Sequence, residues 1–189
     1  PIGKRLDQLE EALRIVRSLW SEKRTTLAGE HFQVTEAYGE PKPLQAHPRI
    51  WIGGGGEKRM LRLVARHADG WNIPFIGPDA YAHKNGVLND WCAREGRDPD
   101  AIVRTVNLGL AMVEHESERS GLEERLRTQF GGMYDVLSAG MLVGTPESVI
   151  ARIHEYRAAG AQWIILAMRA PFDTASLRLF AERVMPAFA

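Results

Sequence analysis

The feature that most constrains the fold is an alternation of short, strand-like apolar segments with longer segments of helical periodicity. The strand-like segments are Ile50–Ile52, Gly70–Phe75, Ile102–Val113 and Trp163–Met168. Each is followed by a segment that is predicted to be helical. Strands that alternate with helices form parallel sheet. The sequence therefore predicts an α/β fold with about four βα units.

The predicted helices have recognisable starts and stops. They are Glu57–His67, Asp79–Glu95, Leu122–Phe130, a helix that begins after Thr145, and a last helix around Leu177–Val184. Thr145 is a good N-cap, and the Pro146-Glu147 pair that follows it suits a first helical turn. Gly96 and Gly160 are suitable stops. The unbroken apolar run Ile50–Ile52 predicts a strand that is buried on both faces.

A different organisation precedes these units. Leucines and other apolar residues recur at helical spacing, which predicts an amphipathic helix over Arg5–Ser21. Strand-forming residues then flank Ala28-Gly29-Glu30, which indicates a small hairpin between Thr25 and Val34. Three prolines exclude regular structure up to Arg49.

Composition excludes several classes of protein. Lys plus Arg and Asp plus Glu both number 24, so the formal net charge is zero, and we expect no nucleic-acid or anionic-lipid partner. No apolar run approaches the ~18 residues of a membrane span. Cys92 is the single cysteine, which favours a reducing cytoplasm. No signal peptide is expected, and a chain that opens on Pro1, just before a helix, reads as if it starts within a longer protein.

The best candidate binding site is a glycine loop. Gly53, Gly54, Gly55 and Gly56 follow a strand, and Glu57 and Lys58 open the next segment. Glycines allow backbone N–H groups to approach a ligand, and a helix start adds free donors and the positive end of the dipole. A tight βα turn that needs glycine only for its geometry is the alternative. Four glycines exceed what a turn needs, which favours a phosphate site.

This loop does not match the two common nucleotide motifs. A P-loop requires Ser or Thr after a Gly-Lys pair, but Lys58 follows Glu57 and precedes Arg59. The dinucleotide motif requires a third glycine where Lys58 or Arg59 stands. These two cations either add charge to a bound phosphate or are solvated residues of the first turn.

Other candidates are weaker. The six histidines form no metal motif and are interpreted as isolated surface residues, so no metal is expected. Cys92 lies beside Leu88 and Trp91 on one helix face and is interpreted as a buried, inert thiol. Trp71, Asn72 and Phe75 lie near the carboxyl end of a strand, where they either line a pocket or serve as core and turn residues.

Three stretches are similar to one known family. Pro41–Gln45, Pro48–Arg59 and Leu61–Asn72 closely resemble the bacterial luciferase-like monooxygenases, and Arg5–Leu13 and Val143–Glu147 resemble that family more loosely. The resemblance covers nearly the whole chain, and its specific part lies between Pro41 and Asn72.

The resemblance implies a TIM-type (β/α)8 barrel. Such a barrel has eight strands and typically ~250 residues, whereas four strands are predicted here. By resemblance these are the fifth to eighth strands, so residues 1–189 are expected to be a single partial domain, the carboxy-terminal half of a barrel with a small hairpin excursion. Since many chemical residues of the family come from the other half, no catalytic residue is assigned.

The resemblance also implies a function. We expect an oxidoreductase or monooxygenase that uses a reduced deazaflavin (coenzyme F420) or FMN for hydride transfer or oxygenation of a small organic substrate. The phosphate-binding turn of the family matches Gly53–Lys58, and the Gly-Gly-Gly-Gly-Glu form resembles the deazaflavin branch. The full-length protein is expected to be a homodimer or larger homo-oligomer, and the fragment alone to be inactive.

Two other classes remain open. One is a non-catalytic α/β module that binds a phosphate ligand, and the other is a subunit that only completes the barrel of a partner. The first predicts binding without turnover, and the second predicts no cofactor affinity of its own. An absorbance in the flavin band would separate the enzyme from both.

Overall fold

The computed structural model describes residues 2–189, so the expectation attached to Pro1 lies outside the described residues. The helices are α1 (Ile2–Ser21), α2 (Met60–His67), α3 (Pro78–Arg94), α4 (Arg119–Phe130), α5 (Tyr134–Ser138), α6 (Pro146–Ala158) and α7 (Thr174–Leu179). The strands are β1 (Thr25–Ala28), β2 (Gln33–Ala37), β3 (Trp51–Gly53), β4 (Gly70–Pro74), β5 (Val103–Met112), β6 (Met141–Gly144) and β7 (Trp163–Leu166). Short turns of helix complete the chain: η1 (Pro99–Ala101), η2 (Glu116–Glu118), η3 (Gly131–Met133), the π-helical η4 (Phe180–Val184) and η5 (Met185–Phe188).

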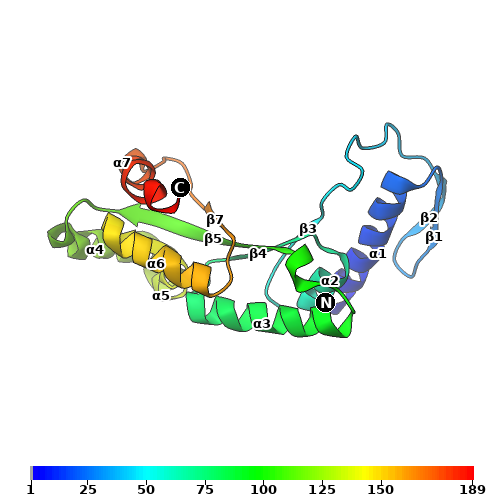
Figure 1. Ribbon diagram of the computed structural model, residues 1–189, viewed down its shortest axis with the longest axis horizontal. Helices are drawn as coiled ribbons and strands as arrows, with labels where there is room; N and C mark the ends of the chain where they lie inside the picture. Colours follow the sequence, from blue (N-terminus) through cyan, green and yellow to red (C-terminus); the bar gives the residue numbers. More distant parts are fainter. Residues whose placement is uncertain (1) are drawn as a thin grey trace.

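A five-stranded parallel sheet organises most of the molecule (Figure 1). Strand β4 pairs with β3 and with the first half of β5, and β7 pairs with the middle of β5. Both β4 and β7 contact Thr105–Asn107, so they lie on opposite edges of β5. The predicted α/β fold with parallel sheet is confirmed. The short strand β6, which pairs with the second half of β5, was not predicted.

The sheet has open edges. Within residues 2–189, β3 pairs only with β4, and β6 and β7 each pair only with β5. A closed barrel leaves no such edges, because every strand then has two neighbours.

Helices α2, α3 and α6 lie on one face of the sheet and form the main core with it (Figure 1). Trp71 of β4 is fully buried and stacks on Tyr81 of α3 with ring centroids 5.3 Å apart. Tyr81 meets Tyr156 of α6 edge to face at 6.3 Å. Such aromatic pairs contribute about 0.5–1.5 kcal/mol beyond the area that they bury. Three aromatic rings therefore join one strand to two covering helices.

The opposite face of the sheet is partly exposed at β3 and β7. Trp51 is 40% exposed and stacks on Trp163, with ring centroids 5.6 Å apart. Gly70 makes this possible, because a Cβ there would lie 2.5 Å from the Trp51 ring. The prediction that Ile50–Ile52 is buried on both faces is wrong: Ile50 and Ile52 pack into the main core, whereas Trp51 points to the side that the helices do not cover.

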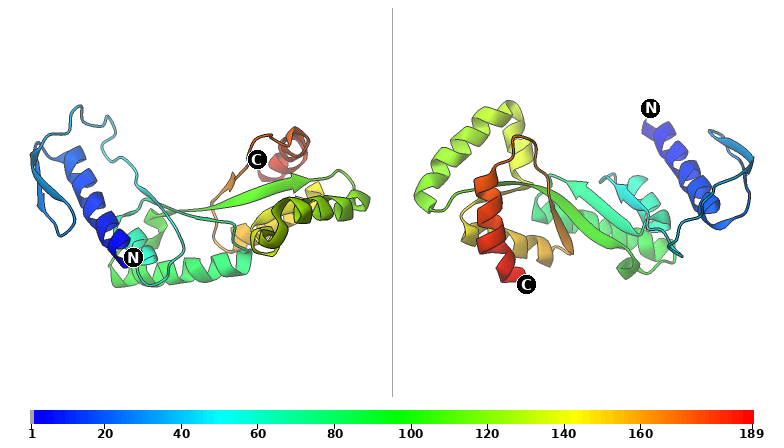
Figure 2. Two further views of the ribbon diagram at one scale, coloured as in Figure 1. Left: turned by 180° about the vertical axis from the view of Figure 1, so that it is seen from behind. Right: turned by 90° about the horizontal axis from the view of Figure 1, so that it is seen from above.

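A second, smaller core holds α4 and α5 against the end of β5. It is built from Ala111, Val113, Leu122, Leu126, Tyr134 and Met141. After α4 the chain continues through the helical turn Gly131–Met133 into α5, which was not predicted from the sequence. Figure 2 shows α4 at one end of the molecule and α1 with the β1–β2 hairpin at the other.

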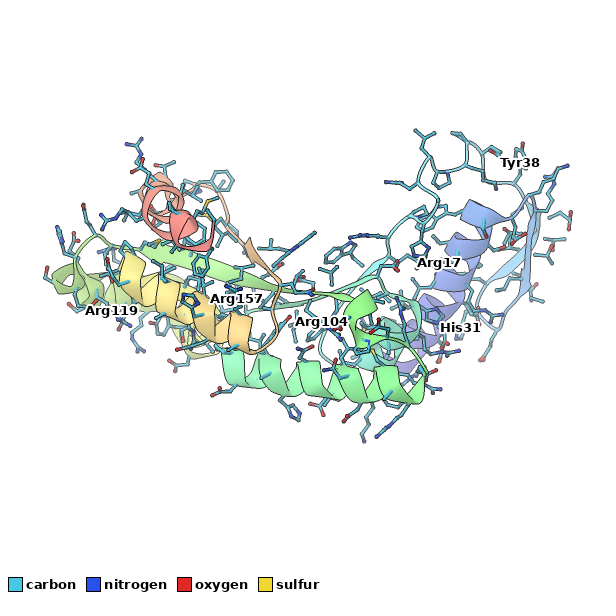
Figure 3. The ribbon with its side chains drawn as sticks, in the orientation of Figure 1. Arg17, His31, Tyr38, Arg104, Arg119 and Arg157 are labelled. Carbon is cyan, nitrogen blue, oxygen red and sulfur yellow. The ribbon has the colours of Figure 1, made fainter. Side chains whose placement is uncertain are left out.

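Polar contacts attach α1 to its surroundings. Glu11 accepts the backbone N–H groups of Glu30, His31 and Phe32, which fixes the hairpin turn on α1. Arg17 extends from α1 (Figure 3). The carboxylate of Asp69 accepts from it at 2.8 Å and from the Ile50 N–H at 2.8 Å. In the described residues, no helix combines the length and the apolar character that a membrane span requires.

Candidate functional site

The glycine loop lies at the carboxyl end of β3, between that strand and α2. Gly54 has a φ of +124°, a conformation that side chains strongly disfavour. The helix begins at Met60 and not at the predicted Glu57, because Glu57–Arg59 form a turn. The loop is therefore longer than a minimal βα turn.

Only two of the four glycines are constrained by the fold itself. Gly54 is required by its φ, and a Cβ at Gly55 would lie 2.4 Å from the tip of the Ile73 side chain, which would have to move. At Gly53 the nearest atom to an added Cβ is the Asn72 carbonyl oxygen at 3.8 Å, and at Gly56 it is the Met60 Cβ at 3.4 Å. Both are ordinary contact distances. A turn that needed glycine for geometry alone would not need it at Gly53 and Gly56.

Three carbonyl groups of the loop accept hydrogen bonds, those of Gly54, Gly56 and Glu57, whereas most of its amide groups have no acceptor in the described residues. Trp71 Nε1–H donates to the Gly54 carbonyl at 2.8 Å, and Trp91 Nε1–H donates to the Glu57 carbonyl at 2.7 Å. The Gly54 N–H is used internally, since it donates to the Asn72 carbonyl at 3.0 Å. Within residues 2–189, the N–H groups of Gly55, Gly56, Glu57 and Lys58 have no acceptor. The loop thus presents a row of four unpaired donors just ahead of a helix start.

Charged groups from α3 flank this row. Lys84 Nζ contacts the Glu57 carboxylate at 2.6 Å, and His83 Nε2 lies 3.1 Å from the same oxygen. The hydrogen bond from Lys84, followed by that from His83, lowers the pKa of Glu57 below its ordinary value. A Cβ at Gly55 would lie 3.8 Å from Lys84 Cε, so the lysine stem runs beside the loop.

The two cations that follow the loop have different surroundings. Arg59 turns to α1, where it contacts Asp7 and the Gly3 carbonyl at 3.2 Å. It is thereby directed away from the loop donors. Lys58 is exposed and pairs with no carboxylate in the described part of the chain. Of the two, only Lys58 has a charge available for a ligand.

The three candidate residues in and just after β4 have different surroundings. Trp71 is fully buried, which agrees with its interpretation as a core residue and not as a pocket residue. Asn72 lies in the strand and not in a turn, and its Oδ1 lies 3.0 Å from the Thr105 hydroxyl, which donates to it. Phe75 has a φ of +50° and lines a cavity under α4.

The histidines are less isolated than predicted. His47 Nε2 lies 2.9 Å from Asp69, His83 contacts Glu57, and His67 is half-buried beside Glu10. Burial, followed by the charge of Arg66, lowers the pKa of His67. In residues 2–189 no group of His, Cys, Asp and Glu side chains is arranged to hold a metal ion.

Cys92 is buried as predicted, and burial raises the pKa of its thiol. A thiol of raised pKa is a poor nucleophile.

Sequence reasoning missed Lys84, His83 and Trp91. All three lie on α3 and reach Glu57 across 26 to 34 residues of sequence. Their residue types give no signal of this, because the contact depends on how α3 is rotated against the loop.

The sequence is similar to proteins of known type. It is 25% identical to the phthiodiolone/phenolphthiodiolone dimycocerosates ketoreductase of Mycobacterium tuberculosis (strain ATCC 25618 / H37Rv), in an alignment that covers 97% of this chain and 60% of that protein. The chain spans 44% to 60% of the length of the curated relatives that it matches.

The structure is similar to two solved enzymes. One is an F420-dependent secondary alcohol dehydrogenase in complex with an F420-acetone adduct, with a TM-score of 0.84 and 19% identity over 100% of this chain and 63% of that chain. The other is a riboflavin lyase with modified FMN and substrate riboflavin, with a TM-score of 0.78 and 16% identity over 98% of this chain and 57% of that chain. At these identities the likeness shows the fold alone, a parallel α/β arrangement similar to that of luciferase-like TIM barrels.

The family profile described as luciferase-like monooxygenase matches residues 1–135, which include α1, the hairpin, the glycine loop and most of the sheet. A parallel sheet of this fold and a family match over more than half of the sequence agree: the chain belongs to the luciferase-like monooxygenase family.

Proposed function

We propose that this chain is the carboxy-terminal half of a luciferase-like oxidoreductase, and that its glycine loop binds the phosphate of coenzyme F420, with FMN as the alternative. One observation carries the proposal. The backbone N–H groups of Gly55 to Lys58 are unpaired, and they lie where parallel α/β folds bind their ligands, at the carboxyl end of a strand. Oxyanions are bound by such rows of amides at helix starts.

The residues present fit a phosphate-bearing cofactor. Gly53 and Gly56 leave open the space that a Cβ would take, so a ligand can approach the backbone. Lys58 supplies a positive charge, and Lys84 supplies a second that is shared with Glu57. The six residues Gly53, Gly54, Gly55, Gly56, Glu57 and Lys58 would form the phosphate cradle, Gly54 through its conformation and not its N–H. When bound, a flavin or deazaflavin supplies the hydride or oxygen chemistry, while the protein binds and orients it.

The half-barrel interpretation is supported by the open sheet. β3 and β7 each lack a neighbour on one side within the described chain, and the Trp51–Trp163 pair lies exposed between them. Strands that pair with these edges would close the barrel and cover the two rings. Because exposed sheet edges recruit other chains, we expect the isolated chain to associate and not to catalyse turnover.

A second candidate function follows from the same edges. A subunit that completes the barrel of a partner would also have two open strands, but it would not need a free amide row at Gly55–Lys58. Cofactor affinity that depends on these residues therefore separates the enzyme from the barrel-completing subunit.

The preference for coenzyme F420 rests on the Gly-Gly-Gly-Gly-Glu form of the loop. The test is reconstitution of the full-length protein with each cofactor, followed by absorbance and equilibrium titration. We expect coenzyme F420 to bind more tightly than FMN. Tight FMN binding without binding of coenzyme F420 would overturn the cofactor preference, and binding of neither would overturn the proposed function.

A further inference from the structure

A cavity of about 550 Å³ lies under α4 at the carboxyl ends of β4 and β7. Its wall is mainly apolar and includes Phe75, Leu126, Phe130, Met133, Met141 and Met168. This volume lies within the range of small-molecule sites. The residues come from the end of β4, from β5, from α4 and α5, from β6 and from the segment after β7, so the cavity exists only in the folded chain.

Two arginines stand at the polar part of this wall. Arg125 comes from α4 and Arg169 from the segment after β7. Neither forms an ion pair with a carboxylate of residues 2–189 at 4.0 Å or less. A guanidinium without a carboxylate partner is a suitable group for binding an anionic ligand, because its planar fork donates two parallel hydrogen bonds.

Asp173 is the one acidic residue of the wall, and it is already engaged. Its Oδ1 accepts from the Ser176 N–H at 3.0 Å and its Oδ2 from the Ser176 hydroxyl at 2.6 Å, which caps α7. Burial would raise the pKa of Asp173, but these hydrogen bonds and the more distant charge of Arg125 hold it below its ordinary value. Asp173 therefore stays charged, and the wall carries two positive charges and one negative charge.

We propose that this cavity binds a substrate with an apolar body and a carboxylate head group, the head group lying at Arg125 and Arg169. The inference rests on the proposed function, because it places the substrate at the same end of the sheet as the cofactor loop. The net charge of the wall is +1 (two arginines minus one aspartate), which matches a singly charged carboxylate better than a doubly charged phosphate monoester. The Met and Phe side chains form an adaptable apolar wall for the rest of the molecule.

The test compares decanoate with decanamide, which have the same chain and differ in head-group charge. Calorimetric titration of the full-length protein should show decanoate binding about tenfold more tightly, the effect of a charge-assisted hydrogen bond. Arg125→Gln and Arg169→Gln should each reduce decanoate affinity by severalfold and leave decanamide affinity unchanged. Arg125→Lys and Arg169→Lys should retain most of the preference. Arg178→Gln, on the exposed side of α7 and outside the cavity wall, is the matched control.

Equal affinity for the two probes, no binding of either, or a preference that survives both glutamine substitutions would overturn the inference. The exposed Trp51–Trp163 face would bind both probes alike, so charge preference identifies the cavity. Cofactor titration on the same samples keeps the two proposals apart. Cofactor binding without a carboxylate preference would refute only the substrate class. Carboxylate preference without cofactor binding would refute the proposed function and leave the cavity as a binding site.

Discussion

Two turns in this molecule have the same plan, a strand that ends in glycine followed by a helix, and they differ in what they leave unpaired. At the end of β6, Gly144 has a φ of +122°, α6 begins two residues later at Pro146, and Thr145 caps it by accepting from the Ser148 N–H. After β3, Gly54 has a φ of +124°, but α2 has no side-chain cap and begins six residues later, at Met60. The first turn caps one donor and lacks another at Pro146, whereas in the described chain four successive N–H groups stay unpaired in the second.

The difference lies in which backbone donors each turn leaves unpaired, and it is the reason for proposing a binding role for the loop after β3 and not for the turn after β6. Pro146 at the first helical position removes one N–H from the turn after β6, and Thr145 satisfies another. In the loop after β3, two tryptophan indoles hold the carbonyls of Gly54 and Glu57, while the amides of Gly55 to Lys58 stay unpaired. A positive-φ glycine does not distinguish the two turns, but the number of amides that they leave unpaired does.

The largest effect is expected at the two positive-φ glycines. Gly54→Ala and Gly144→Ala should each destabilise the fold by about 1–3 kcal/mol, because each places a Cβ on a backbone conformation that residues with side chains disfavour. Gly144→Ala should be the worse, since its Cβ would lie 2.5 Å from Ser148 Oγ. Urea unfolding measures both, and cofactor titration should show a loss of affinity only for Gly54→Ala. Equal loss of affinity in the two variants would contradict the distinction between the turns.

A smaller effect is expected from removing the cap of α6. Thr145→Ala should lower the free energy of unfolding by about 1 kcal/mol, the usual contribution of an N-cap side chain, and leave cofactor affinity unchanged. Thermal unfolding and titration of the same sample provide the two measurements. Gly86→Ala is a useful control for small substitutions: nothing lies within 4 Å of a Cβ there, and it is in the exposed face of α3. It should be neutral or stabilising.

The smallest effect concerns Glu57 and Glu147, which follow Gly54 and Gly144 in the two turns. The pKa of Glu57 is lowered, first by the hydrogen bond from Lys84, and the pKa of Glu147 is lowered, first by the hydrogen bond that its carboxylate accepts from its own backbone N–H. A carboxyl whose pKa is lower in the folded state contributes stability above its unfolded pKa of about 4.3, and it loses that contribution as the pH falls through the folded value. Glu57→Gln and Glu147→Gln should therefore lower the melting temperature slightly at pH 7 and not at all well below pH 4. Differences that persist in strong acid would show that the substitutions act through packing.

The sequence predicted the parts of the fold that rest on local chemistry. The long strand at Ile102–Val113, the helix stops at Gly96 and Gly160, and the Thr145-Pro146 helix start all appear in the structure. It missed β6, because four residues ahead of a cap give too short a pattern to identify a strand. It misjudged Trp51, because an apolar run does not reveal whether both faces of a strand have a covering layer.

Only the part of the candidate site that is contiguous in sequence could be predicted. Gly53 to Lys58 stand together in sequence, so the loop was visible. Lys84 and Trp91 reach it from α3, and Arg125 and Arg169 meet at one cavity across 44 residues of sequence (169 minus 125). Such meetings depend on tertiary packing, for which a single sequence carries no periodic signal.

The most direct test of the glycine loop measures how much the phosphate itself contributes to binding. Full-length protein and its Gly55→Val variant are titrated with the cofactor that binds, and with the form of that cofactor that lacks the phosphate (riboflavin in the case of FMN). The phosphate-free form reports the rest of the site, so general damage cancels in the affinity ratio. We predict that the wild-type protein favours the phosphorylated form by at least about tenfold, or ~1.4 kcal/mol, and that Gly55→Val removes most of this preference. An affinity ratio that is unchanged by the substitution would contradict phosphate binding at the glycine loop.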